Sequence, residues 1–503
     1  MEDHAVSYGF LSILPPVIAI IIAIWRKQVY LSLLFGIWLG WMIISNGHLW
    51  TSIMSTVEAL VNVFQDPGNT RTIMFSALVG ALILLVQKSG GVLGFVKMMD
   101  KMLDKLEHRS PKGKRKLIQL MAWATGVIIF VETSISSLTV GTIFRPVFDK
   151  LKIPREKLAY IADSSSAPTS ILIPLNAWGA FIMGQLFLIG FSNPLTVLFK
   201  SMIYNFYPIF ALFMVPILII TGKDFGPMLK AERRTRRTGK LMNDNAKPLV
   251  SDELIKAKPI KGVKHKAYNM FIPILTMVAM MPFMLAYTGW DKGQEVLAEY
   301  EKAPTVLNKF LFAMENGSGS TSVLMAVIIS LVVAFLLYRF QKILKTKDMV
   351  DYTLKGISEL MPLALLMMMA FAISAVTREL HTGEYVADIT KNWLSPAYVP
   401  FIIFIISSFI AFSTGTSWGT FGIMIPIAVP MAQAMGADVY MTIAAALGGG
   451  VFGDHSSPIS DTTIISSMAS ASDHIDHVKT QLPYALTAGS LAALMYLILG
   501  IMG

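Results

Sequence analysis

Two aspartates, a histidine and many hydroxyl groups interrupt an apolar stretch near the carboxyl end of the chain. The stretch covers residues 448–467, and its polar side chains lie within 453–458 and 460–463. A charged side chain deep in a membrane costs roughly 2.5–3.5 kcal/mol on insertion scales, and such residues are kept mainly where they act on an ion or substrate. Gly453 and Pro458 predict an unwound helix here, which is tolerated only against protein or a water-filled cavity. The alternative is a surface loop between two short helices.

The composition places this interruption in a helical membrane protein. Of 503 residues, 54% are hydrophobic and only 15% are charged, whereas a soluble globular protein has about 25% charged residues. Apolar runs of spanning length, about 20 residues, recur from end to end. The net charge of +10 comes from basic loops between the spans, as the positive-inside rule requires, so no nucleic-acid partner is expected. The chain has no cysteine, which excludes disulfides and thiolate metal sites.

The amino-terminal end indicates the orientation. Residues 1–4 are acidic rather than basic, and the first apolar run lacks a cleavage-type ending, so it is predicted to be a retained span and not a signal peptide. The run ends at Arg26 and Lys27, which places that end in the cytoplasm and the amino terminus outside. We therefore expect a multi-pass protein of a bacterial-type cytoplasmic (inner) membrane, surrounded by lipid, with both termini outside.

The first half is predicted to contain three spans, a re-entrant hairpin, a broken span and a final span. They lie at residues 9–25, 29–46, 72–87, 117–131 with 138–150, 156–190 and 201–221. The hairpin is expected to enter from the cytoplasm, because each arm is shorter than a span and both outer ends are basic. The broken span is expected to be interrupted at 163–168. Two surface helices are also predicted, an outer one at 50–70 and an inner, basic amphipathic one at 88–116.

The second half repeats this order upside down. Its membrane segments lie at 267–288, 321–340, 350–377, 397–412 with 419–435, 438–470 and 480–502. In support of the pairing, residues 136–146 align without a gap on 416–426. The predicted fold is an all-α polytopic membrane protein with two inverted-topology repeats, 1–222 and 267–503, joined by a basic cytoplasmic linker, 223–266. This architecture is typical of transporters whose site lies at the midplane between the repeats.

Two hairpin tips and two helix breaks supply two sets of ligands for a cation. Half-helix carboxyl ends, hydroxyls and freed carbonyls are hard oxygen donors that suit Na⁺, whereas half-helix amino ends suit a carboxylate. We expect one Na⁺ near Asp163 and another near Asp454 and Asp461. The other candidate ion- or substrate-binding residues are polar side chains at these tips and breaks: Thr133, Ser134, Ser136, Ser137, Ser164, Ser165, Asn176, Thr414, Thr416, Ser417, His455, Ser456, Ser457 and Thr462.

Several of these residues also have simpler explanations. Ser and Thr in membrane helices often only satisfy backbone groups, which is the preferred explanation for a single serine but not for two clusters at equivalent repeat positions. Glu132 and His455 have no counterpart in the other repeat, and each is either a proton carrier or a structural pair partner. Trp178 and Trp418 could line an organic-solute pocket with Asn176, although packing is the commoner use of tryptophan.

Two further patterns receive structural explanations. Residues 473–477 (Asp-His-Ile-Asp-His) have the residue types of a metal site, but they lie where the last span begins, so helix capping by Asp473 and Asp476 is predicted. Residues 367–369, three methionines, are predicted to be packing within a span and not a copper site. No nucleophile–base pair, nucleotide-binding motif or metal-ligand spacing indicates an enzyme or a bound cofactor. Coupling energy must therefore come from an ion gradient.

The chain resembles the NhaC family of Na⁺/H⁺ antiporters, within the ion-transporter superfamily. The resemblance rests on residues 453–463 (GDHSSPISDTT) and 414–420 (TGTSWGT) and extends over nearly the whole chain except the linker. The family includes Na⁺/H⁺ exchangers, a malate/lactate exchanger and proteins assigned to amino-acid transport. Ion-exchanging members tend to have Lys-Met after the motif's Gly-Asp, where this chain has His455 and Ser456. Residues 163–179 are more similar to the organic-solute, amino-acid branch.

The residues and the resemblance together predict a secondary active transporter. We expect Na⁺-coupled movement of a small carboxylate-bearing solute, most of all an amino acid, by alternating access. The alternative is a Na⁺/H⁺ antiporter without an organic substrate, and an ion channel comes third because a channel rarely needs two inverted broken-helix sites. We expect no cofactor besides Na⁺ as the coupling ion. The sequence leaves open symport or antiport, and a monomer or a homodimer.

Overall fold

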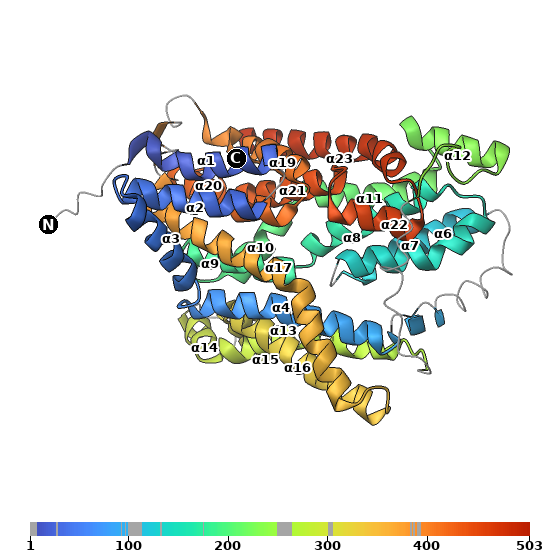
Figure 1. Ribbon diagram of the computed structural model, residues 1–503, viewed down its shortest axis with the longest axis horizontal. Helices are drawn as coiled ribbons and strands as arrows, with labels where there is room; N and C mark the ends of the chain where they lie inside the picture. The colour runs from blue at the N-terminus through green and yellow to red at the C-terminus, as the bar shows by residue number, and fades with distance from the viewer. Residues whose placement is uncertain are drawn as a thin grey trace.

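The computed structural model shows a helical chain over the residues that it describes (Figure 1). These are residues 8–26, 29–91, 93–95, 97–98, 113–130, 133–174, 176–248, 264–299, 305–382, 385, 388–389 and 394–502. Most of the predicted amphipathic helix at 88–116 therefore lies outside the described residues, as does Glu132. Within the described ranges, the β-type pairing is limited to an isolated bridge between Pro248 and Asp473.

Long apolar helices confirm the prediction of a polytopic helical membrane protein. In the described part of the chain, seven helices are long and apolar enough to cross a membrane, or eight if a bent helix counts as one span. They are α4 (Pro67–Lys88), Phe206–Thr238, α13 (Tyr268–Thr288), α16 (Gly319–Phe340), Pro396–Thr414, α20 (Ser417–Met435), α23 (His474–Met502) and the bent α17 (Thr346–Glu379). Two shorter apolar helices, α1 (Leu14–Arg26) and α2 (Val29–Ile44), lie where the first two spans are predicted.

Shorter helices occupy the predicted outer surface segment, 50–70, and the segment between the first two predicted spans of the second half. These are α3 (Leu49–Asn62) before α4, and α14 (Trp290–Glu299) with α15 (Val306–Glu315) between α13 and α16. The start of α4 is fixed by its own sequence, because Asp66 accepts the backbone N–H of Asn69 at 2.7 Å and Pro67 occupies the first helical position.

Two helical hairpins lie where the re-entrant segments are predicted. The first joins α6 (Lys114–Ile128) to α7 (Thr133–Lys150), and the second joins α19 (Val399–Thr414) to α20. Gly415 at the second tip has a φ of +70°, and a Cβ on it would lie 2.7 Å from the carbonyl oxygen of Ile459. Only glycine combines that left-handed conformation with so close an approach. The tip of the second hairpin therefore lies against the chain just after α21 (Val439–Ser456).

The predicted break at residues 163–168 is wrong, because α8 (Arg155–Leu172) passes through them without interruption. Hydroxyl groups in this segment stay in the helix by donating to carbonyls one turn earlier, as Ser165 does to Ile161 at 2.7 Å. The helix ends at Leu172, and the next helix starts a few residues later. There Asn176 begins α9 (Ala177–Leu188) by accepting the backbone N–H groups of residues 178 and 179.

The second broken helix has its break at residues 457–460, between α21 and α22 (Asp461–Ser470). Gly453 was expected to belong to the break, but it is helical and faces α19, where a Cβ would lie 2.3 Å from the backbone nitrogen of Phe412. One turn earlier, a Cβ on Gly449 would lie 2.5 Å from the carbonyl oxygen of Phe404. Small residues four apart let the backbones of α19 and α21 touch.

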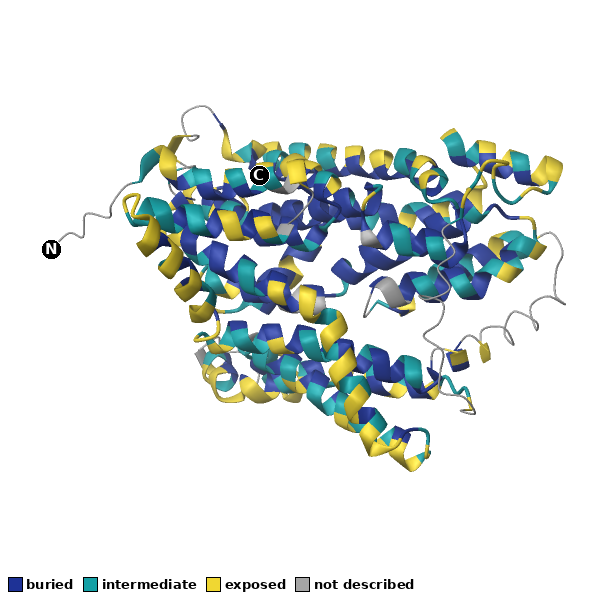
Figure 2. Ribbon diagram, viewed as in Figure 1, coloured by how far each residue is buried: buried dark blue, intermediate teal, exposed yellow. Residues whose placement is uncertain are grey.

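The helices form two packed groups (Figure 1). One contains α4, α13, α16 and α17, and the other contains α6 to α8, α11 (Phe206–Thr221), α19 and α20 to α23. In the first group α4 crosses α17 at Gly80 and Gly356, where a Cβ on Gly80 would lie 2.2 Å from the Gly356 carbonyl oxygen. Burial is densest in the second group (Figure 2), where nearly every residue of α8 and α21 is buried. Polar side chains on these two helices must therefore find partners inside the protein.

The basic linker contains a helix that is packed on the second group. This helix, α12 (Gly226–Thr238), contacts α8 and α23. Arg234 pairs with the buried Glu156 of α8 at 2.9 Å, and the Asn243 amide donates to Asp476 of α23 at 2.7 Å. The linker is therefore tied to α8 by an ion pair and to α23 by a hydrogen bond. The division into 1–222, 223–266 and 267–503, and the inverted relation of the repeats, stay predictions.

Candidate functional site

Two buried aspartates lie on neighbouring helices, Asp163 in the middle of α8 and Asp454 in the last turn of α21. Their exposed fractions are 0% and 2%. Among the described residues, no group of three or more His, Cys, Asp or Glu side chains could hold a metal ion. A cation bound at either aspartate would therefore take most of its ligands from hydroxyl, amide and carbonyl oxygens. Such hard ligands suit Na⁺ better than a transition metal.

Asp454 receives a hydrogen bond at each carboxylate oxygen. Ser417 donates to Oδ2 at 2.6 Å, and Ser460 donates to Oδ1. The Ser460 hydroxyl also lies 3.0 Å from that of Thr462, and these four residues are called the Asp454 cluster. Ser417 begins α20 and Ser460 immediately precedes α22. Two helix amino ends therefore point their positive dipoles toward the buried carboxylate and favour its charge.

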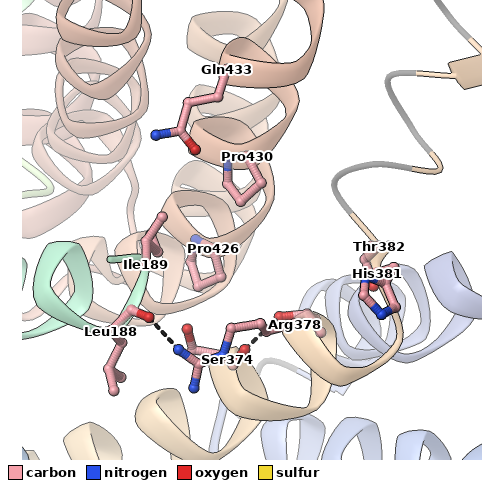
Figure 3. A pocket seen from close by; sticks show the side chains of 10 residues that line it. Leu188, Ile189, Ser374, Arg378, His381, Thr382, Pro426, Pro430 and Gln433 are labelled. Atoms are coloured by element: carbon pink, nitrogen blue, oxygen red, sulfur yellow. Dashed lines mark hydrogen bonds between the residues drawn. The ribbon is translucent and has the colours of Figure 1, made fainter. Parts of the chain in front are cut away.

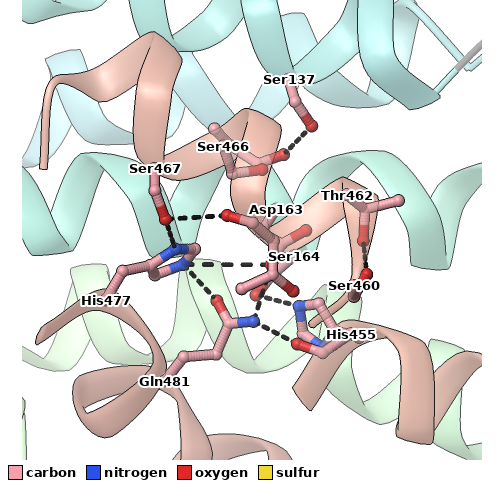
Figure 4. Close-up of polar contacts among 12 residues, drawn as sticks. Ser137, Asp163, Ser164, His455, Ser460, Thr462, Ser466, Ser467, His477 and Gln481 are labelled. Carbon is pink, nitrogen blue, oxygen red and sulfur yellow. Dashed lines mark hydrogen bonds and ion pairs between the residues drawn. The ribbon is translucent and has the colours of Figure 1, made fainter. Parts of the chain in front are cut away.

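Asp163 is held by two residues of α23 that lie one helical turn apart (Figure 4). The Gln481 side-chain nitrogen donates to Asp163 Oδ2 at 2.8 Å and also to the backbone carbonyl of His455. His477 Nε2 lies 3.9 Å from the same Asp163 oxygen and 2.9 Å from Gln481 Oε1. These three side chains, Asp163, His477 and Gln481, are called the Asp163 cluster. One glutamine thus joins α8, α21 and α23.

His455 connects α8 and α11 to α21. Its Nε2 lies 2.9 Å from the Ser164 hydroxyl, and its Nδ1 lies 2.7 Å from the Tyr207 hydroxyl. Because a hydroxyl can donate or accept, these two partners satisfy both nitrogens of a neutral imidazole in either tautomer. In the structure His455 thus has the hydrogen-bond contacts of a structural pair partner, which is one of the two roles that the sequence left open.

Several predicted site hydroxyls bond to backbone carbonyls, as the simpler explanation proposed. Within single helices, Thr414 donates to Ile410 at 2.8 Å and Ser456 donates to Phe452. The remaining pairs join different segments: Ser136 to the Gly126 carbonyl at 3.0 Å, Ser457 to the Phe412 carbonyl at 2.7 Å and Ser137 to the Ser166 hydroxyl at 2.8 Å. Of these hydroxyls, those of Ser137 and Ser457 join a hairpin to a broken helix.

Asn176 joins the first hairpin to the first break. Its amide nitrogen donates to the carbonyls of Phe130 at 3.2 Å and Ser170 at 2.7 Å, while its oxygen accepts from the start of α9. Nearby, the rings of Trp178 and Trp418 pack edge to face with centroids 5.8 Å apart. The two tryptophans therefore pack against each other. The Asn176 side chain links backbone groups of neighbouring segments.

The structure describes only some of the remaining predicted site residues. Thr133 begins α7 and is buried, and Thr416 immediately precedes α20. Glu132 and the side chains of Ser134 and Asp461 lie outside the described residues.

A cavity of about 200 Å³ lies away from both aspartates, between the carboxyl halves of α17 and α20 (Figure 3). Arg378, His381 and Gln433 line it, and Arg378 donates to the carbonyl of Leu188. Its lining contains neither Asp163 nor Asp454. The cavity is therefore separate from the two carboxylate clusters.

Comparison with known proteins identifies the family. The profile of the Na⁺/H⁺ antiporter family matches residues 188–501. This chain belongs to the Na⁺/H⁺ antiporter family. A Haemophilus influenzae protein described as uncharacterized is 31% identical over 99% of this chain and 92% of its own length.

Two characterised relatives of this antiporter-family chain match a smaller part of it. The malate-2H⁺/Na⁺-lactate antiporter of Bacillus subtilis is 29% identical over 23% of this chain and 28% of its own length. The arginine/ornithine antiporter ArcD of Halobacterium salinarum is 32% identical over 22% of this chain and 23% of its own length. Among solved structures, the YdaH transporter of Alcanivorax borkumensis aligns with a TM-score of 0.53 at 15% identity, covering 89% of this chain and 88% of that one. At this identity the alignment shows a similarity of fold alone.

Sequence reasoning did not identify four polar residues that contact one of the two aspartates or His455 in this antiporter-family chain. They are Tyr207, Ser460, His477 and Gln481. Ser460 lies inside the 453–463 motif and could have been included. His477 and Gln481 are spaced by four on a helix, which places them on one face, but nothing local shows that α8 lies opposite.

The helix-capping prediction for residues 473–477 is confirmed for Asp473. Its side chain accepts the backbone N–H of Asp476 at 2.9 Å and that of Lys247 at 2.8 Å. Partial burial acts to raise the pKa of Asp473, but these amide donors, with that of Ile475, hold the pKa below its usual value. His477 of the same segment is fully buried, so the segment both begins a helix and contributes to the site.

Proposed function

We propose that this antiporter-family chain couples Na⁺ to the movement of a small carboxylate-bearing solute, most of all an amino acid, by alternating access. The observation that carries the proposal is the Asp454 cluster. There a buried carboxylate, with oxygen atoms as its side-chain neighbours, lies where α19 and α21 end and α20 and α22 begin. Broken helices and hairpin tips around a buried carboxylate are the usual ion site of secondary transporters.

A second Na⁺ is proposed at Asp163. Its carboxylate is fully buried and accepts a hydrogen bond from the side-chain nitrogen of Gln481, and the Ser164 hydroxyl is on the adjacent residue. A carboxylate charge at this depth is costly. A bound Na⁺ would lower that cost by placing a positive charge beside the carboxylate.

The organic solute is proposed on two grounds. The amino ends of α9 and α20 are half-helix ends whose dipoles suit a carboxylate. In addition, two relatives are named as antiporters of carboxylate-bearing solutes, one of malate and lactate and one of arginine and ornithine. His455 and Ser456 replace the Lys-Met pair that the ion-exchanging members tend to have.

Na⁺/H⁺ exchange without an organic solute is the second candidate. It is favoured by the family to which the chain belongs and by His477, whose Nε2 lies 3.9 Å from Asp163. In either case the protein carries out transport, and we assign no catalytic step to it. We also propose an inner-membrane location with both termini outside, in support of which the basic linker and the acidic 289–320 segment have opposite charge.

A thermal-shift screen of the purified protein tests the proposal. Amino acids and other small carboxylates are added with Na⁺ and, separately, with K⁺ at the same ionic strength. A true substrate at about 100 times its Kd should add about 2.7 kcal/mol of apparent stability, and that gain should require Na⁺. If Na⁺ alone stabilises the protein and reconstituted vesicles exchange Na⁺ for H⁺, the second candidate replaces the first.

A further inference from the structure

Another cavity, of about 440 Å³, lies where the carboxyl half of α9 packs against the amino ends of α4 and α16 (Figure 1). Met183 and Phe187 of α9 form part of its wall, and neither Asp163 nor Asp454 lines it. Small-molecule sites occupy about 300–1,000 Å³. The cavity is therefore large enough for a small organic solute, and it is separate from both carboxylate clusters.

One guanidinium and one carboxylate line this cavity. They belong to Arg71 and Asp66, which are both partly buried. Side chains meet on a helix when they are three or four positions apart, whereas these two residues are five positions apart. Accordingly, they do not pair with each other among the ion pairs of the described residues. The cavity thus presents two opposite charges that are not neutralised by direct contact.

Arg71 is placed where local forces disfavour a cation. Within the described ranges, its guanidinium has no hydrogen-bond or ion-pair partner. The side chain leaves α4 in the second helical turn and leans toward the amino end, as helical side chains do. A cation is unfavourable near that end of the helix dipole. The positive-inside rule also disfavours it on the outer side, where α4 is proposed to begin. An arginine in this position is explained if it binds an anion.

Asp66 retains an oxygen for a ligand. Its Oδ1 accepts the backbone N–H of Asn69 at 2.7 Å, which fixes the start of α4. Its Oδ2 accepts no hydrogen bond from a described residue. An ionised carboxylate offers about four acceptor positions on its two oxygens, so Oδ2 is available to an ammonium group.

The rest of the lining is of two kinds. The first residues of α4 and of α16 contribute at 67–68 and 319–320, so two helix amino ends open on the cavity and favour a carboxylate there. Met183, Phe187 and Pro194 add apolar surface. The lining therefore combines a site for a carboxylate, an acceptor for an ammonium group and a wall for an apolar side chain.

We infer that this cavity binds a zwitterionic α-amino acid with an apolar side chain. Arg71 binds the α-carboxylate through two parallel N–H donors. Asp66 Oδ2 accepts from the α-ammonium group, and the solute's side chain packs on the α9 wall. A dicarboxylate would bring a like charge to Asp66, and an amine without a carboxylate would leave Arg71 unpaired. The two charges therefore select against both of these classes.

Helix α9 connects this cavity to the first helix break. It begins at Ala177, directly after Asn176, and reaches the cavity at Met183 and Phe187. In the proposed function, the cavity is the entry site of the solute on the outer side. That role rests on the proposed function, whereas the binding itself does not.

Calorimetric titration of the purified protein with L-leucine tests the site. Two analogues each lack one of the two charges: 4-methylpentanoate has no ammonium group, and 3-methylbutylamine has no carboxylate. L-Leucine should bind at least about tenfold more tightly than either analogue, because hydrogen bonds to charged groups are the strong ones.

The Arg71 variants test the carboxylate half of the site. Arg71→Gln should weaken the binding of L-leucine about tenfold or more and abolish its preference over 3-methylbutylamine. Arg71→Lys, which keeps the charge but not the planar fork, should restore part of that preference. Arg339→Gln is the matched control, because Arg339 lies in the last turn of α16, at the end away from the cavity.

Asp66→Asn tests the ammonium half. It should abolish the preference for L-leucine over 4-methylpentanoate and leave the preference over 3-methylbutylamine. Asparagine begins helices about as well as aspartate, so the melting temperature should not change. Asp438→Asn is the matched control, because Asp438 begins α21 in the same way and does not line the cavity.

Failure of the site and failure of the proposed function give different results. If L-leucine does not bind, or if Arg71→Gln and Asp66→Asn change its Kd no more than their controls do, the site is wrong. Stabilisation by another carboxylate that requires Na⁺ would then still support the proposed function. If L-leucine binds with the expected dependence on both residues but shows neither Na⁺ dependence nor uptake into vesicles, the site stands and Na⁺-coupled transport fails.

Discussion

Gln481 donates a hydrogen bond to Asp163 over 2.8 Å, although the two residues are 318 positions apart in the chain. The same amide nitrogen reaches the His455 carbonyl, and the amide oxygen accepts from His477. One uncharged side chain thus satisfies a buried carboxylate, the end of a broken helix and a buried imidazole. Each of these groups would be costly to leave unpaired at this depth.

Replacing Gln481 by Leu should destabilise the protein. Leu has a similar volume but neither donor nor acceptor, and each buried polar group left unsatisfied costs roughly 1–3 kcal/mol. The midpoint of thermal unfolding in detergent should therefore fall well below that of the wild type. Thr487→Val is the control on the same helix, since the Thr487 hydroxyl is exposed and bonds only to the Pro483 carbonyl. Equal midpoints for the two variants would contradict the bridging role of Gln481.

Neutralising Asp454 should abolish the stabilisation by Na⁺. Asp454→Asn keeps the size of the side chain and an acceptor for one of its two serine donors, but it removes the formal charge that a hard cation needs. Wild-type protein should gain about 2.7 kcal/mol at a Na⁺ concentration of about 100 times Kd, and the variant should gain almost nothing. Asp438→Asn is the matched control at the other end of α21, where the side chain only accepts the Met441 N–H at 2.8 Å. A Na⁺ response that survives in Asp454→Asn would remove this residue from the ion site.

A methyl group at Gly453 should push α21 away from α19. The added Cβ would lie 2.3 Å from the Phe412 nitrogen and 2.4 Å from the Ala411 side chain, and overpacking of this kind costs about 1–3 kcal/mol. Since Asp454 is the next residue, Gly453→Ala should lower both the melting temperature and the apparent affinity for Na⁺. Gly113→Ala provides the comparison, because no atom lies within 4 Å of the Cβ it would add. Unchanged Na⁺ affinity in Gly453→Ala would show that this helix contact does not position Asp454.

The membrane helices and one of the two helix breaks could be predicted from the sequence alone. Apolar windows of spanning length determine a helix because backbone groups cannot remain unpaired in lipid. The break at residues 457–460 follows from serines and a proline together with a carboxylate. The break predicted at 163–168 failed because Ser165 can satisfy its hydroxyl inside a helix as well as at a break. The better signal was Ile173-Pro174 followed by Asn176, a strong helix-starting residue.

The site was predictable only where its residues share a motif. Asp454 and Thr462 lie within one short string, and the hairpin residue Ser417 came from the repeat alignment. His477 and Gln481 could not be found in this way, because their partner is on a helix more than 300 residues earlier. A histidine and a glutamine near the start of an apolar helix look like ordinary interfacial residues until the neighbouring helix is placed.

The contribution of Asp473 to stability should depend on pH. Amide donors lower the pKa of its carboxyl in the folded protein, so its contribution is present above the unfolded pKa of about 3.9 and is lost as the pH falls through the folded value. Asp473→Ala should cost about 0.5–2 kcal/mol at neutral pH, as for other helix-starting residues. The difference in melting temperature from the wild type should shrink as the pH falls below about 4. A constant difference from pH 7 to the acid limit would show that the charge of Asp473 does not contribute.

The linker should face the cytoplasm, which single-cysteine labelling can decide because the chain has no cysteine of its own. Arg237 is exposed on α12 within the basic linker, and Gln65 is exposed just before α4 in the segment predicted to be outside. The excess of Lys and Arg in the linker favours the cytoplasmic side. In intact cells, an impermeant thiol reagent should therefore label Gln65→Cys and not Arg237→Cys, and after lysis it should label both. Labelling of Arg237→Cys in intact cells would reverse the proposed orientation.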